Sequence, residues 1–210
     1  MSQPGRGMRQ LAILLLLQAA PVWAGFCSAV SSAPEPRHDF QFFAGYSPVS
    51  TTLIGTTSDR RFVMAGFGYS YRCWVWPGVS VAYTGELMPA AVLLQPGQYL
   101  PSFEPAHAVY GFAATPLGFR ADFGRRHRVY PFVEINSGII ASSEPIPINV
   151  YGATGLNFLV DAGGGVRIKT GPRRGISLGY KFLHISNGFT SPVNPGVDNN
   201  VIYAGFSFLK

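Results

Sequence analysis

Apolar and polar residues alternate along most of the chain, a pattern typical of β-strands. Gly, Pro and polar residues separate the alternating segments. We expect strands over residues 39–47, 61–73, 78–88, 107–123, 128–141, 155–169, 174–186 and 199–209. The fourth segment contains Pro116, which cannot donate a backbone hydrogen bond, so we expect a break or a bulge there.

The alternation also indicates what each face of a strand contacts. Successive side chains of a strand point to opposite faces. In residues 174–186, aliphatic and aromatic side chains therefore share one face, while Ser177, Gly179 and Lys181 share the other. Residues 199–209 repeat this arrangement. A lysine on the inside and an apolar outer face are typical of a transmembrane β-barrel.

The connections between the expected strands alternate between long and short. In order they are residues 48–60, 74–77, 89–106, 124–127, 142–154, 170–173 and 187–198. Outer-membrane barrels have an even number of strands, short periplasmic turns and longer extracellular loops. We therefore expect residues 39–210 to form an eight-stranded antiparallel transmembrane β-barrel of the bacterial outer membrane.

Composition supports this fold class. The chain is 47% hydrophobic and only 12% charged, with 25 Gly and 16 Phe among 210 residues. A typical soluble domain is roughly one quarter charged. After the N-terminus no apolar run is long enough for a spanning helix. A soluble lipocalin-like barrel would also show eight strands, but it should hide its apolar residues inside.

The N-terminal residues predict export. Arg6 and Arg9 precede an apolar run, and small residues follow near Ala24, so residues 1–24 read as a signal peptide. Residues 25–38 are expected to form an irregular periplasmic lead-in. Cys27 and Cys73 would meet an oxidising compartment at the same end of the barrel, where a disulfide between them is possible. The alternative is that each cysteine packs as a small hydrophobe.

Candidate chemistry lies where the seventh strand ends and the eighth begins. His184 and Ser186 are two residues apart, so they share a face about 6–7 Å apart. His184 and Ser186 fall on the same alternating positions as the apolar, outward-facing residues of their strand. Asp198 falls on the equivalent outward-facing positions of the next strand. The three side chains can therefore converge on the outer wall at its extracellular end. Ser-His-Asp chemistry would explain such costly polar groups there, whereas the structural alternative is a set of ordinary rim residues.

The segment His184-Ile185-Ser186-Asn187-Gly188, followed by Asn194-Pro195-Gly196 and Asp198, resembles the outer-membrane lipid A 3-O-deacylase (PagL) family. This resemblance implies a serine esterase on the outer wall of an eight-stranded barrel that hydrolyses the 3-O-acyl ester of lipid A. By the same resemblance, Ser186 would be the nucleophile, His184 the base and Asp198 the acid. The family's best-known acid is a glutamate, which is one methylene longer. Asn187, Gly188 and Asn194 match the other polar and glycine positions of the motif and are candidates for an oxyanion hole.

We expect lipid A or lipopolysaccharide as substrate, no metal, no cofactor and no nucleic-acid partner, and a monomer or homodimer in the outer membrane. His38, His107 and His127 lack metal-ligand spacing. Arg125, Arg126 and Arg128 are best explained as a solvated periplasmic turn. The alternative function is a non-enzymatic small barrel whose loops are adhesive or structural.

Overall fold

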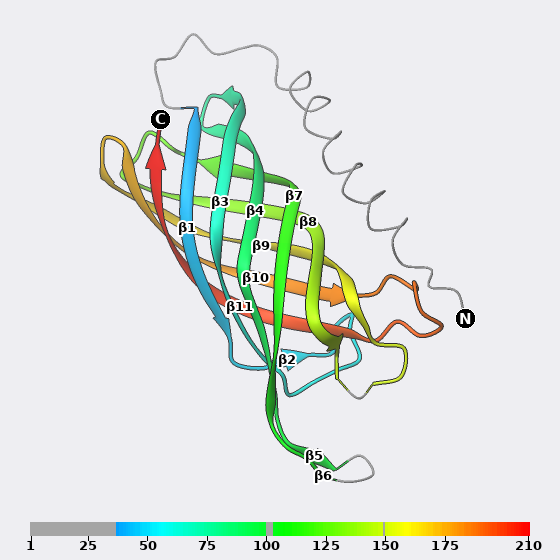
Figure 1. Ribbon diagram of the computed structural model, residues 1–210. Helices are drawn as coiled ribbons and strands as arrows, with labels where there is room; N and C mark the ends of the chain where they lie inside the picture. The colour runs from blue at the N-terminus through cyan, green and yellow to red at the C-terminus, as the bar shows by residue number, and fades with distance from the viewer. Residues whose placement is uncertain (1–36, 100–102, 149) are drawn as a thin grey trace.

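The computed structural model describes residues 37–99, 103–148 and 150–210. Eight long strands of this part form one closed sheet (Figure 1). In spatial order they are β1 (His38–Ser47), β3 (Arg61–Trp76), β4 (Val79–Gln95), β7 (His107–Phe123), β8 (Val129–Ile146), β9 (Thr154–Gly171), β10 (Arg174–Ser186) and β11 (Gly196–Leu209).

Closure comes from the first and last strands of this order. β1 pairs antiparallel with β11, from Asp39 opposite Leu209 to Tyr46 opposite Ile202. The other neighbouring pairs of long strands are antiparallel as well. The predicted eight-stranded antiparallel barrel is therefore confirmed.

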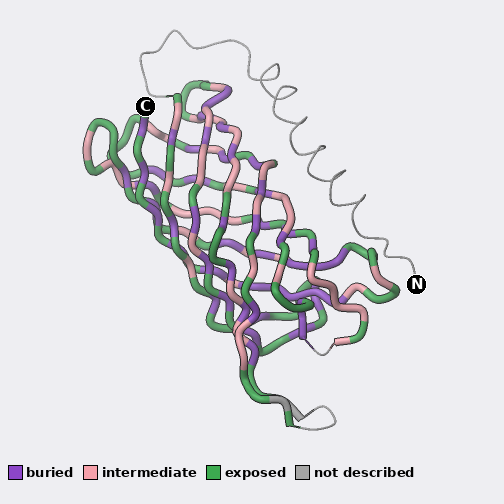
Figure 2. Tube along the Cα trace, in the orientation of Figure 1, coloured by how far each residue is buried: buried purple, intermediate pink, exposed green. Residues whose placement is uncertain are grey.

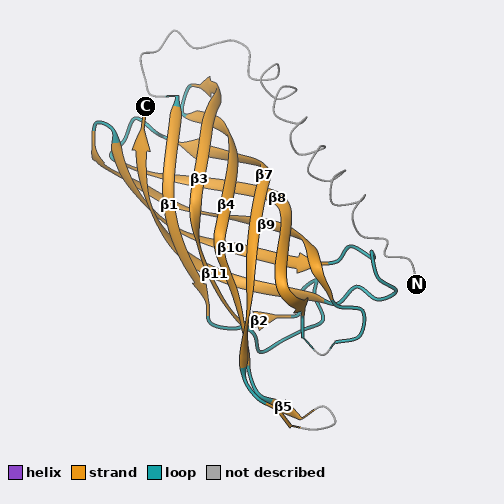
Figure 3. Ribbon diagram, in the orientation of Figure 1, coloured by secondary structure: helices purple, strands orange, loops and turns teal. Residues whose placement is uncertain are grey.

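The two ends of the barrel differ (Figure 3). Three short turns at one end join β3 to β4, β7 to β8 and β9 to β10, and the C-terminus lies at the same end. The opposite end carries the longer connections, including the short strand β2 (Ser50–Thr51) and the projecting hairpin of β5 (Gln98–Tyr99) and β6 (Phe103–Glu104). By the loop-length rule for outer-membrane barrels, this second end is extracellular.

Several strands extend further than the sequence pattern indicates. β4 continues to Gln95 and β8 to Ile146, since paired strands hydrogen-bond beyond the alternating segment. β11 begins at Gly196, so Asp198 lies within a paired strand rather than before one. The register of β7 against β8 shifts between Ala114 and Leu117, which places the expected irregularity at Pro116.

The outward face is apolar along most of the barrel, and Figure 2 shows buried and exposed positions alternating along the strands. In β10, Leu178 is 49% exposed and Tyr180 44%, while their neighbours Ser177 and Lys181 are buried. Among the described residues, no helix is long and apolar enough to cross a membrane.

The interior towards the periplasmic end is filled by paired ions. Arg120 lies 3.0 Å from Asp39 and 3.1 Å from Asp122, and Arg167 also pairs with Asp39. Nearer the middle, Lys181 Nζ lies 2.6 Å from Glu86, 3.2 Å from Glu134 and 3.5 Å from Asp161. These side chains occupy the space that a pore would need.

The interior towards the extracellular end is mostly apolar, and it also holds a buried hydrogen bond of 2.9 Å between Arg60 and Gln95. Fully buried side chains there include Phe62, Met64, Leu93, Leu183 and Val197. Both faces of β3 are apolar here, because Val63 faces outward between Phe62 and Met64. The simple alternation therefore disappears from the sequence, although the strand continues.

Two predictions fall on residues that the structure does not describe. The signal peptide over 1–24 and almost all of the lead-in over 25–38 lie outside the described residues, and both stay predictions. Cys27 also lies outside them, whereas Cys73 is buried near the periplasmic end of β3. The disulfide between them stays a prediction.

Replacing Lys181 with Met should destabilise the barrel by about 3–5 kcal/mol, because three buried carboxylates lose their shared cation. The urea midpoint of the heat-modifiable gel shift in detergent measures this loss. Lys210→Met, at an exposed terminal lysine, is the matched control and should leave the midpoint unchanged. Adding Glu86→Gln to the Lys181 variant should restore part of the stability. A urea midpoint of the Lys181 single variant equal to that of the native protein would contradict the stabilising role of these ion pairs.

Candidate active site

The predicted Ser186, His184 and Asp198 come from the paired ends of β10 and β11. His184 lies directly opposite Asp198 in the antiparallel register, and Ser186 lies opposite Gly196. Opposed residues of an antiparallel pair point to the same face. Because Tyr180 in β10 and Ile202 in β11 share this parity and are exposed, the face is the outer wall.

His184 and Asp198 form a close pair. His184 Nδ1 lies 2.6 Å from Asp198 Oδ1, and the Asp198 side chain is fully buried. Direct opposition across the strand pair explains why the shorter aspartate reaches the ring. When Nδ1–H donates to this carboxylate, Nε2 is the unprotonated nitrogen and can act as a base.

The second oxygen of Asp198 is held by the backbone of the loop between β1 and β3. The N–H groups of Ile54 and Gly55 donate to Asp198 Oδ2 at 2.7 and 2.8 Å. The strand β2 brings this loop to the site, because Thr51 pairs with Asp198 on the edge of β11 that extends beyond the end of β1. The carboxylate therefore keeps hydrogen bonds on both oxygens, although it is buried.

Two glycines make this close approach possible. A Cβ on Gly55 would lie 2.5 Å from the carbonyl oxygen of Gly196. A Cβ on Gly196 would lie 2.7 Å from Cε1 of His184 and 3.4 Å from its Nε2. The imidazole thus lies over Gly196, which is the register partner of Ser186.

Ser186 lies on the same face but is not joined to the histidine. It is 8% exposed and pairs with Phe158 of β9 on its other side. Among the hydrogen bonds of the described residues, none links Ser186 Oγ to His184. Catalytic contacts can be long in the absence of substrate and can tighten in the complex.

The three oxyanion candidates have different partners. Asn187 is fully buried, and its amide nitrogen donates to the carbonyls of Gly152 and Val193 at 2.8 and 2.9 Å. This side chain therefore ties two loops together, which leaves its amide no proton for an oxyanion. The Gly188 N–H donates to Asn194 Oδ1 at 3.1 Å. Within the described part of the chain, Asn194 Nδ2 has no hydrogen-bond acceptor.

Apolar side chains surround this face at the extracellular rim. Leu53 and Ile54 of the β1–β3 loop are 76% and 64% exposed. On the other side, Phe189 is 76% exposed and Phe158 49%. The Asn187 bonds bring the β8–β9 loop to the same side, with Tyr151 at 76% exposure.

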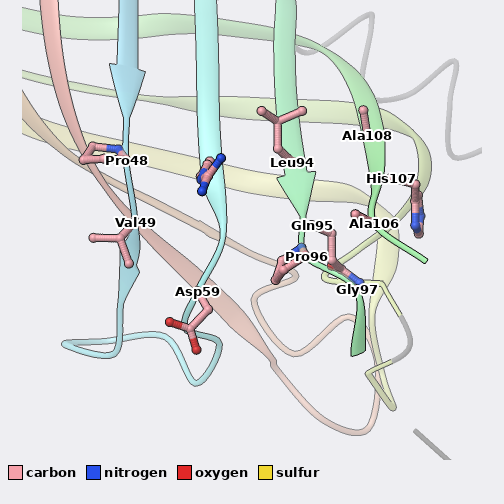
Figure 4. Close-up of a pocket in the computed structure, with 11 residues that line it drawn as sticks. Pro48, Val49, Asp59, Leu94, Gln95, Pro96, Gly97, Ala106, His107 and Ala108 are labelled. Carbon is pink, nitrogen blue, oxygen red and sulfur yellow. The ribbon is translucent and has the colours of Figure 1, made fainter. Parts of the chain in front are cut away.

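A large hollow of the molecule lies elsewhere on the extracellular end. It measures about 750 Å³ and lies between the starts of β3 and β7 and the end of β4 (Figure 4). Arg61, Asp59 and His107 line it together with Pro48, Val49 and Leu94. None of the three predicted catalytic residues lines it, and in the part of the chain that is described no group of His, Cys, Asp or Glu has a metal-binding arrangement.

Sequence reasoning missed the loop that holds Asp198. The donors are backbone amides of Ile54 and Gly55, and a backbone amide has the same identity at every non-proline position. The one local signal is Gly55 in a loop, which by itself indicates a turn as readily as a close approach.

The chain is similar to one protein family and to several solved structures. The family model described as Lipid A 3-O-deacylase (PagL) matches residues 63–207. No curated protein sequence matches the chain. The outer membrane enzyme PagL has a similar solved structure, with 15% identity, a TM-score of 0.58, and coverage of 80% of this chain and 97% of that one.

Two other solved barrels are similar in fold. Neisserial surface protein A is 13% identical, with a TM-score of 0.52 and coverage of 81% of this chain and 96% of that one. The outer membrane protein OprG from Pseudomonas aeruginosa is 12% identical, with a TM-score of 0.50 and coverage of 84% and 97%. At these identities the structures establish only the fold, an outer-membrane β-barrel. Since the family model spans more than half of the chain, the protein belongs to the lipid A 3-O-deacylase (PagL) family.

Proposed function

We propose that this protein is an outer-membrane serine esterase that hydrolyses the ester-linked 3-O-acyl chain of lipid A. The observation that carries the proposal is the His184–Asp198 pair on the outer wall, beside Ser186, in a chain of the deacylase family. The pair lies at the extracellular end, where lipid A would lie against the wall in the outer leaflet. The ester would then reach the serine without leaving the membrane.

The proposed reaction has two halves. Ser186 Oγ attacks the ester carbonyl while His184 Nε2 takes its proton, and Asp198 stabilises the imidazolium through Nδ1–H. The tetrahedral intermediate collapses as the imidazolium protonates the departing sugar oxygen, which leaves an acyl-serine. Water then gives a proton to His184 and attacks the acyl-serine. The imidazolium returns this proton to Ser186 Oγ as the acyl bond breaks, which releases the fatty acid and regenerates both residues.

The surroundings of Ser186 support a lipid substrate. Phe158 and Phe189 on one side and Leu53 and Ile54 on the other are exposed apolar side chains that an acyl chain could contact. Asn194 Nδ2 is our candidate oxyanion donor, because Asn194 Oδ1 accepts from Gly188 N–H and so orients the amide.

Ser186→Ala should abolish release of the fatty acid, because the attacking oxygen is removed. Mass spectrometry of lipid A from cells that express each variant measures the acyl chain, and the heat-modifiable gel shift reports the folded barrel. Ser191→Ala, in the same loop region but outside the proposed site, is the matched control and should retain activity. Hydrolysis by a folded Ser186→Ala barrel would refute the proposal and favour a non-enzymatic barrel.

Asp198→Asn should lower kcat by about 10²- to 10⁴-fold, because the neutral amide neither stabilises the imidazolium nor selects the Nδ1–H tautomer. The rate of fatty-acid release from purified lipid A in detergent measures it. Asp59→Asn, at an exposed carboxylate of the β1–β3 loop, should leave kcat unchanged. Equal rates for Asp198→Asn and the native protein would remove Asp198 from the mechanism.

Gly55→Ala should lower kcat by about tenfold or more with little change in KM. Asp198 would lose its position, and displacement of a catalytic group can lower the reaction rate by orders of magnitude. The added methyl would meet the Gly196 carbonyl, so the loop must withdraw both amides from Asp198. Gly171→Ala is the matched control, because a Cβ there meets nothing within 4 Å. A Gly55 variant with native kcat would show that the loop does not position the acid.

A further inference from the structure

Cations that lie apart in the sequence gather at the periplasmic end of the barrel. The turn between β7 and β8 exposes Arg126 and Arg128, and Arg173 in the next such turn and Arg174 at the start of β10 are exposed as well. Arg37 and Lys210 are exposed beside the paired ends of β1 and β11. We call these six residues the basic collar.

Among the described residues, no carboxylate side chain pairs with Arg126, Arg128, Arg173 or Arg174. The acidic side chains at this end are Asp39 and Asp122, which are 4% and 1% exposed. Both are paired with arginines inside the barrel. The described side chains on the outside of this end are therefore mainly cationic.

A shallow hollow of about 400 Å³ lies between two of the turns. Arg126, Arg128 and Lys169 line it, together with Thr170, Gly171 and Pro172. Lys169 is positioned there, because its Nζ donates to the Arg125 carbonyl at 2.6 Å and lies 5.8 Å from the centre of the Tyr130 ring. Three cations thus surround a space large enough for a phosphate group.

The hollow adjoins the lipid-facing band. Val129 follows Arg128 and is 53% exposed on the outer wall. Arg174 is two residues from Ile176, so both face outward in β10. Trp76 is 54% exposed and lines a neighbouring hollow together with Arg126. An aromatic side chain and cations beside an apolar band are typical of the level of lipid headgroups.

We propose that the hollow lined by Arg126, Arg128 and Lys169 binds the phosphate of an anionic phospholipid of the inner leaflet. Guanidinium groups bind phosphate oxygens through paired N–H donors, and basic residues near a bilayer attract anionic lipids. A soluble anion or water would contact only the cations of this turn. A phospholipid would contact the cations with its phosphate and the adjoining apolar wall with its acyl chains. The bound lipid would hold the barrel at a defined depth, independently of whether the protein is an esterase.

The test uses the protein without its predicted signal peptide. The tryptophans that remain, Trp74 and Trp76, both lie at the periplasmic end of the barrel. The protein is placed in phosphatidylcholine nanodiscs that contain a small share of a lipid with brominated acyl chains. This brominated lipid is phosphatidylglycerol in one sample and phosphatidylcholine in the other. Quenching of tryptophan fluorescence measures how much of the brominated lipid lies beside the tryptophans. We expect phosphatidylglycerol to be preferred about fivefold at low salt and the preference to vanish near 0.5 M salt. Equal quenching by the two lipids would overturn the proposal.

Arg126→Gln/Arg128→Gln should reduce the preference to about twofold or less. Arg37→Gln/Lys210→Gln removes the same charge from the same end, away from the hollow, and should leave most of the preference. Equal losses in the two double variants would overturn the site in favour of diffuse attraction. Sodium phosphate and sodium chloride of equal ionic strength should reduce the preference for phosphatidylglycerol equally. A larger reduction by phosphate would overturn the lipid site in favour of a site for soluble phosphate.

Discussion

The antiparallel pairing of β1 with β11 is the constraint on which the rest of the structure depends. A strand in a bilayer has no water to satisfy its backbone, so every N–H and C=O must be paired within a closed sheet. Closure fixes the register of β11 against both of its neighbours. That register places Asp198 opposite His184 and leaves an open edge of β11 beyond the end of β1, where β2 pairs.

Closure also creates a narrow interior that side chains must fill. The periplasmic part and the middle are filled by buried ions such as Arg120 and Lys181, each within reach of more than one carboxylate. The extracellular part is filled mostly by apolar side chains. A buried charge is costly unless it is paired, so the ions are arranged as networks. The interior is thus filled, and the candidate site lies on the outer surface of the wall rather than in a cavity.

The candidate site combines residues of the barrel wall with backbone groups of a loop. His184 and Ser186 are held by the strand β10, whereas the second oxygen of Asp198 is held by two amides of the β1–β3 loop. Gly55 and Gly196 allow the backbone of that loop to lie against β11. This arrangement suits an aspartate: the acid is short, but it faces the ring directly and the loop closes over it.

The sequence by itself determined the number of long strands, the alternation of long and short connections, and the face on which His184, Ser186 and Asp198 lie. These features follow from a period of two and from turn residues, which are local properties of the chain. Only the tertiary structure decided the direct opposition of His184 and Asp198, the amides that hold Asp198, the loop-anchoring role of Asn187 and the apolar upper interior. Each of these depends on the register between strands, on backbone groups of distant loops or on how the interior is filled, and none of these is visible in the order of side chains along one strand.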